Sequence, residues 1–170
     1  MKKFILLFCS IMLLVVFNNN VFAQKKNKNL AAFYNYEVQC MGTCMDGTQL
    51  VKVWGYGKKP NDAIEQAKKN AVQAVMFKGI TSGQPGCMMR PLITDPGAEQ
   101  QHQDYFVAFF KEKGKYLNFV NVSNDGSIDP KDRLKAGKEY KIGVLVSVSH
   151  AALRKELESA GIIKALGQGF

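Results

Sequence analysis

The stretch VWGYGKKPNDAIEQAKKNAVQAVMFKG at residues 53–79 decides the fold of this chain. Its second half predicts a helix over residues 63–78, because apolar residues recur there at helical spacing. Asp62 is the expected N-cap, and Glu65 three residues later completes a capping box. Gly79 can adopt the backbone conformation that ends a helix. The stretch therefore contains a start signal, an apolar side and a stop signal.

The side of this helix that we expect to be buried consists largely of alanine. Small side chains let a helix approach its support closely, and glycines in a strand leave matching space. Gly55 and Gly57 remove two side chains from the strand that precedes the helix. We therefore expect the helix to lie over this strand with an alanine stripe against the glycines. The stripe comprises Ala63, Ala67, Ala71 and Ala74.

The glycine-bearing strand belongs to a predicted hairpin. Residues 33–40 alternate between apolar and polar side chains, which is typical of a half-buried strand, and residues 49–56 form a second strand rich in Val, Leu and Trp. Asp46-Gly47 lies between them and is a strong signal for a two-residue turn. If that turn closes the hairpin, Cys40 faces Val53.

The rest of the chain continues with helices and strands. A long loop is expected at residues 80–97 and a polar turn at 124–133. The other predicted elements are a helix over 98–112, strands over 116–122 and 140–148, and a helix over 151–160. The order β-β-α-α-β-β-α predicts an α+β fold, with an antiparallel sheet of about four strands and helices packed on one face. We expect a single domain over residues 32–164 and a loose tail over 165–170.

The N-terminus carries the pattern of a secretory signal peptide. Lys2 and Lys3 precede an almost unbroken apolar run over residues 4–17, and Val21-Phe22-Ala23 supplies small residues where a signal peptidase reads. We expect cleavage between Ala23 and Gln24. Cleavage there removes residues 1–23, leaves a flexible basic tail at 24–31, and makes the mature chain periplasmic or secreted.

Two alternatives would keep this segment attached to a membrane. A retained anchor needs about 20 apolar residues to span a bilayer, and the run at residues 4–17 is shorter. A lipoprotein would use Cys9, but the bulky Phe8 directly before that cysteine disfavours lipid attachment. We therefore expect no stable membrane span after cleavage.

The chain is basic, with 23 Lys and Arg against 14 Asp and Glu and a formal net charge of +9. A moderate excess of this kind is usually spread over a solvated surface. The sequence has neither a basic stripe with interleaved aromatics nor a known nucleic-acid module, so we expect no nucleic-acid partner. Weak attraction to anionic lipid or polysaccharide fits the charge.

The cysteines of the mature chain predict one disulfide. Residues four apart in an extended strand, such as Cys40 and Cys44, are ~13 Å apart, whereas a disulfide needs Cα atoms within ~7 Å. In an oxidising compartment we therefore expect Cys40 to pair with Cys87, and Cys44 to stay a free thiol near the surface.

No motif identifies a catalytic centre. Ser149 and His150 are adjacent, which does not fit the geometry of a catalytic triad, and no GxSxG motif is present. Residues 121–132 carry oxygen-bearing side chains at calcium-loop spacing, but Asn121 replaces the usual leading Asp and Asp132 the longer Glu. We expect no catalytic residue, no cofactor and no metal site, with calcium in residues 121–132 as the open alternative.

Large aromatic residues cluster in the predicted helix over residues 98–112. We expect them to belong to the core, and the alternative is a partner or ligand patch at one edge of the fold. They are Tyr105, Phe106, Phe109 and Phe110.

Phe22-Ala23-Gln24 followed by lysines resembles the signal region of exported proteins of Bacteroidota. The strand and helix at residues 53–72 are similar to small uncharacterised exported proteins of that group. They are more remotely similar to the LPP20 lipoprotein family and to flagellar-assembly periplasmic domains. Those families are structural or assembly modules, so the resemblance implies no catalytic residues. The lipid-bearing cysteine of the lipoprotein members is missing here.

These expectations favour a non-enzymatic exported protein of the cell envelope, which acts as a binding or assembly module for an envelope protein or glycan. One alternative is an exported hydrolase with an unrecognised site, which needs a deep pocket with acidic or His groups of shifted pKa. The other is a calcium-stabilised structural domain. A broad, shallow aromatic surface would favour the binding module.

Overall fold

The computed structural model describes residues 36–85, 89–123 and 126–165. By its internal contacts the chain divides into two units, Met1–Asn35 and Tyr36–Phe170, and all described elements belong to the second. The predicted signal peptide, its cleavage site and the basic tail lie outside the described residues, as does Cys87.

The described elements give the α+β fold that the sequence predicts. The strands are β1 (Val38–Thr43), β2 (Gln49–Gly57), β3 (Val120–Val122), β4 (Arg133–Ala136) and β5 (Glu139–Val148). The α-helices are α3 (Pro60–Gln73), α4 (Ala98–Gln101), α5 (Gln103–Phe109) and α6 (His150–Ser159). Shorter helical segments are η3 (Ala74–Lys78, a π-helix) and the 3-10 turns η5 (Lys115–Phe119) and η7 (Pro130–Asp132).

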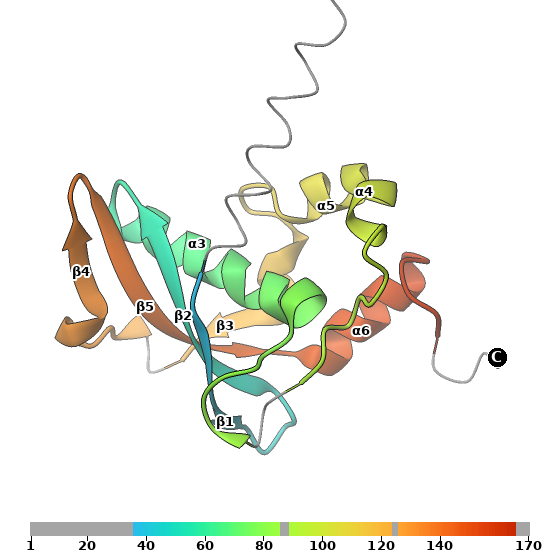
Figure 1. Ribbon diagram of the computed structural model, residues 1–170, viewed down its shortest axis with the longest axis horizontal. Helices are drawn as coiled ribbons and strands as arrows, with labels where there is room; N and C mark the ends of the chain where they lie inside the picture. The colour runs from blue at the N-terminus through green and yellow to red at the C-terminus, as the bar shows by residue number, and fades with distance from the viewer. Residues whose placement is uncertain (1–35, 86–88, 124–125, 166–170) are drawn as a thin grey trace, which may run out of the picture. The chain divides into compact units, whose positions relative to one another are not determined.

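The strands form one antiparallel sheet in the order β1-β2-β5-β3, and β4 also pairs with β5. β5 is long enough to hold two partners on its outer side. Its C-terminal residues 146–148 pair with β3, and its N-terminal residues 139–142 pair with β4. Figure 1 shows β4 and the start of β5 as a hairpin at one end of the sheet, with α6 continuing from the other end of β5.

Helix α3 covers one face of the sheet, as the alanine stripe and the glycines predict (Figure 1). A Cβ atom placed on Gly55 would collide with the carbonyl oxygen of Ala63 and would lie 2.5 Å from the amide nitrogen of Ala67. A Cβ atom on Gly57 would lie 2.5 Å from the amide nitrogen of Ala63. The helix therefore touches the strand backbone, and the two glycines make this approach possible.

The predicted start of this helix is wrong. The helix begins at Pro60, and Asp62 occupies its third position, where its carboxylate accepts a hydrogen bond from the backbone N–H of Lys59. Proline suits the first helical position because its missing N–H would have no partner there. Glu65 does not close a capping box and instead accepts hydrogen bonds from other side chains. The end at Gly79 is confirmed, with the left-handed φ of 77° that favours glycine.

The predicted register of the first hairpin is also wrong, since Cys40 pairs with Val51 and Val53 pairs with Val38. One reason is a longer turn, in which Gly47 N–H donates to the carbonyl of Cys44 at 2.9 Å. The other is a bulge between Cys40 and Gly42. The turn and the bulge each shift the strand register by one residue. The total shift of two residues leaves every side chain on the predicted face, because the side-chain period of a strand is two.

Three further segments differ from the prediction. The helix expected over 98–112 is divided into α4 and α5, and the strand expected from 116 begins with the turn η5. Strand β4 begins at the last residue of the polar turn expected at 124–133 and covers residues for which no element was predicted. The strand over 140–148 and the last helix are confirmed as β5 and α6.

The core lies between the sheet and the helices. Phe106 and Phe109 of α5 are buried, and Tyr105 of α5 and Phe110 directly after the helix are partly buried against them, which confirms the core role of this aromatic row. The stacked rings of Phe109 and Phe119, 5.8 Å apart, connect α5 to η5. Within the described ranges, no helix has the length and apolar character needed to cross a membrane.

Candidate binding face of the sheet

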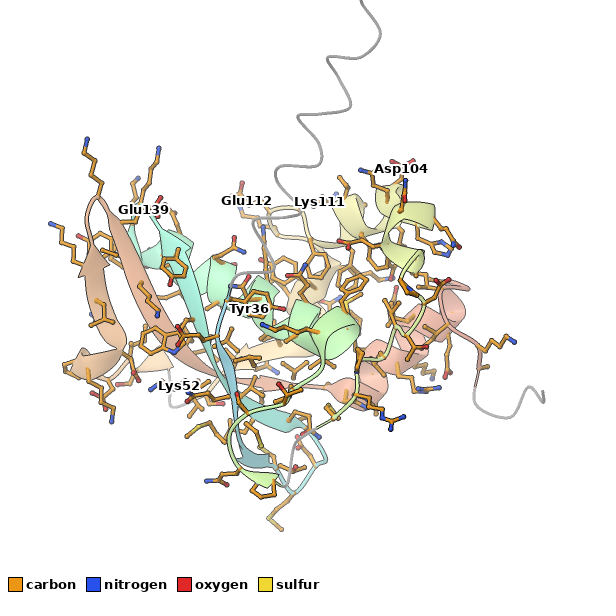
Figure 2. The ribbon with its side chains drawn as sticks, viewed as in Figure 1. Tyr36, Lys52, Asp104, Lys111, Glu112 and Glu139 are labelled. Atoms are coloured by element: carbon orange, nitrogen blue, oxygen red, sulfur yellow. The ribbon has the colours of Figure 1, made fainter. Side chains whose placement is uncertain are left out.

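The two faces of the sheet have different side chains. On the face toward α3, β2 and β5 present buried apolar residues such as Val51, Val53 and Val144. The side chains that alternate with them form the opposite face, which we call the open face, and they stay at least partly exposed apart from Gly143. The open face comprises Leu50, Lys52, Trp54 and Tyr56 of β2 with Lys141, Gly143, Leu145 and Ser147 of β5. Figure 2 shows Lys52 on the side of the sheet away from α3.

Trp54 lies at the middle of the open face, over Gly143. The two residues are directly paired across β2 and β5. A Cβ atom on Gly143 would lie 3.2 Å from Trp54 ring carbons and 3.2 Å from the Cε of Lys52. Because Gly143 has no side chain, the indole ring and the stem of Lys52 can both lie close to the sheet backbone.

The backbone of Trp54 is held from both sides. Its N–H donates to the carbonyl of Glu37 in the chain just before β1, at 3.1 Å. Its carbonyl accepts a hydrogen bond from Nδ2 of Asn70, a buried residue of α3, at 2.9 Å. Gln66 one turn earlier donates to Oδ1 of Asn70 at 2.9 Å and so fixes the orientation of that amide. Trp54 is therefore positioned by the helix on the far side of the sheet.

Two ion-paired lysines flank the indole ring. Lys141 Nζ lies 4.8 Å from the ring centroid of Trp54 and 2.9 Å from Oε1 of Glu37. Lys52 Nζ lies 5.4 Å from the same ring and 2.5 Å from Oδ1 of Asp132 in η7. The hydrogen bond to Glu37 raises the pKa of the Lys141 ammonium above its ordinary value. We call Trp54, Lys52, Lys141, Glu37 and Asp132 the Trp54 cluster.

Next to the Trp54 cluster, the open face exposes apolar surface. Leu134 of β4 pairs with Lys141, and Lys141 pairs with Tyr56, so that the three side chains form one row across β4, β5 and β2. Tyr56 is 41% exposed and Leu134 is 46% exposed. Lys141 Nζ also lies 5.8 Å from the ring centroid of Tyr56. This row combines an exposed aromatic ring, an exposed apolar side chain and the lysine between them.

None of the described carboxyl groups with a clearly shifted pKa belongs to the Trp54 cluster. Both lysines are ion-paired, and a general acid would need a raised carboxyl pKa. Wherever a described carboxyl group departs clearly from its ordinary pKa, hydrogen bonds that stabilise the charged form lower it. This holds for Asp46, Asp129 and Glu156, and for Glu65, where burial acts in the opposite direction.

Ser149 and His150 do not form a catalytic pair. Ser149 is the N-cap of α6 and His150 is its first residue. Burial, and then the charge of Arg154, lower the pKa of His150. In the described part of the chain, the imidazole has no hydroxyl group as a hydrogen-bond partner.

The residues proposed for a calcium loop are engaged elsewhere or are not described. Asn124 and Asp125 lie outside the described residues. Asp129 forms an ion pair with Lys131 at 2.9 Å and caps η7, and Asp132 pairs with Lys52. No group of three or more His, Cys, Asp or Glu among the described residues could hold a metal ion.

Two cysteines of the predicted mature chain, Cys40 and Cys44, lie within the described residues. Cys44 is a free, half-buried thiol, and Cys40 is buried and disulfide-bonded. The segment that leads toward Cys87 runs beside Cys40, because Cys40 N–H donates to Ser82 at 2.8 Å and the carbonyl of Cys40 accepts from Gln84 at 3.0 Å. Cys87 lies outside the described residues, so its pairing with Cys40 stays a prediction.

Sequence reasoning does not find the Trp54 cluster. The alternation of β2 is enough to place Lys52, Trp54 and Tyr56 on one face. The partners, however, come from the segment before β1, from η7 and from β5, and only the strand register brings them together. The aromatic row of residues 105–110, which the sequence offers as an alternative ligand patch, belongs to the core.

Comparisons of the chain with protein-family models, with curated proteins and with solved structures find no match.

Proposed function

We propose that this chain is an exported, non-enzymatic protein of the cell envelope that binds an envelope protein or glycan through the open face of its sheet. The supporting observation is the Trp54 cluster with the adjoining row of Tyr56, Lys141 and Leu134, in which Tyr56 and Leu134 are exposed. Aromatic side chains supply large contact area, and cations and carboxylates beside them supply directional contacts. Such a surface supports the binding of an envelope protein or glycan.

The export part of the proposal rests on the N-terminal sequence. If it is correct, the native protein recovered from cells begins at Gln24 and is found in the periplasmic or extracellular fraction. N-terminal sequencing and fractionation measure both. A native chain that still begins at Met1 and is recovered from the cell interior would contradict export.

The binding part is tested by measuring how much of the purified protein the envelope fraction of the producing cells retains. We expect the double variant Tyr56→Ala, Leu134→Ala to be retained at least about fivefold less than the wild type, because truncation of central contact residues typically costs more than ~1 kcal/mol. The matched control is Met45→Ala, Val107→Ala, which also removes two exposed apolar side chains, 108% and 49% exposed.

Equal retention of the two double variants would overturn the role of the open face. Thermal unfolding of both variants checks that they are folded. Hydrolysis of envelope material by the purified wild-type protein, lost in the open-face variant, would instead support the hydrolase alternative.

A further inference from the structure

A group of exposed cations surrounds the end of the open face at which Tyr56 and Leu134 lie. Arg133 and Lys135 belong to β4, and Lys138 lies in the turn between β4 and β5. Lys58 and Lys59 follow Gly57, which pairs with Tyr140 at the base of this turn. All are exposed, and none forms an ion pair with another described residue. We call Lys58, Lys59, Arg133, Lys135 and Lys138 the basic hairpin.

The two β4 cations of the basic hairpin lie on the side of the sheet opposite to the open face. In β4, Leu134 pairs with Lys141 and so lies on the open face, whereas Arg133 and Lys135 pair with Ile142 and Tyr140. Neighbouring residues of a strand point to opposite faces. The cations of β4 therefore lie on the other side of the strand from Leu134. In Figure 2, Glu139, the first residue of β5, marks this hairpin.

We propose that the open face and the basic hairpin together bind an acidic polysaccharide, a flexible, hydroxyl-rich chain that carries carboxylate groups. This inference rests on the proposed function and names the class of its ligand. Free cations attract the carboxylates of such a chain, and their arrangement around an edge strand fits a polymer that bends from one face of β4 to the other.

The open face also suits the uncharged part of this ligand. The Tyr56 ring is exposed and can pack against the apolar face of a sugar ring. The side chain of Glu37 is 62% exposed and keeps a carboxylate oxygen free to accept hydrogen bonds from hydroxyl groups. Lys141 is fixed beside both residues and can donate to a sugar oxygen. Aromatic, acceptor and donor groups therefore meet within one row.

Other polyanionic partners fit less well. A planar anionic bilayer that contacts Leu134 and Tyr56 would leave Arg133 and Lys135 on the far side of the strand, and it would meet the exposed carboxylate of Glu37. A nucleic-acid strand offers few hydroxyl donors to that carboxylate. Lysines on an edge strand can also serve only to prevent aggregation; in that case their replacement changes solubility and no ligand is bound.

Trp54 provides the measurement, because it is the only tryptophan of the chain and lies in the site. We expect polygalacturonate to change the Trp54 fluorescence of the purified chain in a saturable manner, and raised salt to weaken the binding. Neutral dextran at equal mass, phosphatidylglycerol vesicles and oligo-thymidylate serve as comparison probes. We expect each of them to bind more weakly than polygalacturonate.

Charge reversal tests the basic hairpin. We expect Lys135→Glu, Lys138→Glu to weaken polygalacturonate binding by roughly tenfold or more, because each basic residue near an anionic partner contributes ~1 kcal/mol. The control Lys155→Glu, Lys164→Glu changes the net charge equally at exposed residues outside the basic hairpin, on α6 and after it. We expect this control variant to weaken polygalacturonate binding less than twofold.

Three results would overturn the inference: no binding of polygalacturonate, equal weakening in the two charge-reversal variants, or tighter binding of vesicles or oligo-thymidylate. If polygalacturonate does not bind but the open-face variant still loses envelope retention, the ligand class is wrong and the proposed function stands. If both results are negative, the proposed function fails as well.

Discussion

Gly55 and Gly143 lie on neighbouring strands and make room on opposite faces of the sheet. At Gly55 the neighbours of an added methyl group would be backbone atoms of α3, and a helix backbone cannot move without displacing its whole packed face. At Gly143 the neighbours would be the ends of the Trp54 and Lys52 side chains, at 3.2 Å. We therefore expect an added methyl group to destabilise the fold more at Gly55 than at Gly143.

We predict that Gly55→Ala lowers the free energy of unfolding by about 3 kcal/mol and Gly143→Ala by about 1 kcal/mol, because overpacking against rigid backbone is harder to relieve. Urea unfolding measures both. Gly143→Ala should also shift the Trp54 emission of the folded protein, since the ring must move. Equal destabilisation by the two variants would contradict the close approach of α3 to β2.

The two ion pairs beside Trp54 differ in exposure, and we predict that they contribute differently to the free energy of unfolding. The side chains of Lys52 and Asp132 are 20% and 12% exposed, whereas Glu37 is 62% exposed. Asp132→Asn should lower the free energy of unfolding by about 1–3 kcal/mol, because a charge-assisted hydrogen bond is lost in a sheltered place. Glu37→Gln should cost less than about 1 kcal/mol. Chemical denaturation of the two variants gives the comparison, and the reverse order would refute it.

At the scale of elements, hydrogen bonds to two glutamates connect α3 to η5 and α6 to both α5 and η5. Glu65 of α3 accepts hydrogen bonds from Tyr116 of η5 at 3.0 Å and from Lys68 at 2.7 Å. Glu156 of α6 accepts from Tyr105 of α5 at 2.9 Å and from Lys115 of η5 at 2.6 Å. Burial and these hydrogen bonds raise the pKa of both tyrosines, so that each stays a neutral donor.

These contacts predict an acid-sensitive fold. For Glu156, the hydrogen bond from Lys115 lowers the pKa below its ordinary value of 4.5. For Glu65, burial acts upward, but the hydrogen bonds from Lys68 and Tyr116 outweigh it and the pKa is again lowered. A lowered folded-state pKa means that the stabilisation is complete above pH 4.5 and is lost as the pH falls through the folded-state value.

We therefore expect the free energy of unfolding to decrease as the pH is lowered from 5 to 3. Glu65→Gln and Glu156→Gln should each cost about 1 kcal/mol at pH 7 and should make stability less dependent on pH in the acidic range. Asp104→Asn, at an exposed position of α5, is the control and should leave the pH dependence unchanged. Urea midpoints across this pH range test the prediction, which fails if the Gln variants keep the wild-type dependence.

The elements that sequence could predict are those with their own periodic signal. The alanine stripe of α3 and the alternation in β5 depend on neighbouring residues only, and both are present. Strand β4, with the sequence Arg-Leu-Lys-Ala, alternates polar and apolar residues over only four positions and is exposed along its whole length, so its own pattern is weak and its pairing with β5 defines the strand. The register of the first hairpin depends on a bulge and on a longer turn, and no residue pattern predicts either of them.

The candidate site was less predictable than the fold for the same reason. Trp54 could be assigned to a strand from its neighbours, but Asp132 lies far along the chain and reaches Lys52 only because η7 precedes a strand that pairs with β5. The importance of Gly143 likewise follows from its pairing with Trp54. Contacts between distant segments carry this information, and a single sequence does not display them.

For the whole molecule, the predicted disulfide between Cys40 and Cys87 joins β1 to the loop after α3. We expect Cys87→Ser to lower the free energy of unfolding by about 3–4 kcal/mol, because the crosslink restricts the unfolded chain. Reductant should destabilise the wild type similarly and leave Cys87→Ser unchanged, whereas Cys44→Ser should have little effect. Urea unfolding with and without reductant, together with thiol titration, tests this. A second accessible thiol in the oxidised wild type would contradict the pairing.

The hydrogen bonds that residues 82–84 make to β1 have a consequence for how copies of this protein meet. The outward-facing groups of Val38 and Cys40 are already occupied, by Ser82 Oγ at 2.6 Å and by the backbone of Ser82 and Gln84. An incoming strand from another molecule finds no free partners there, and at β4 it meets like charges. We expect lateral growth at β1 and β4 to be blocked at low salt, and growth at β4 to begin once salt screens Arg133 and Lys135.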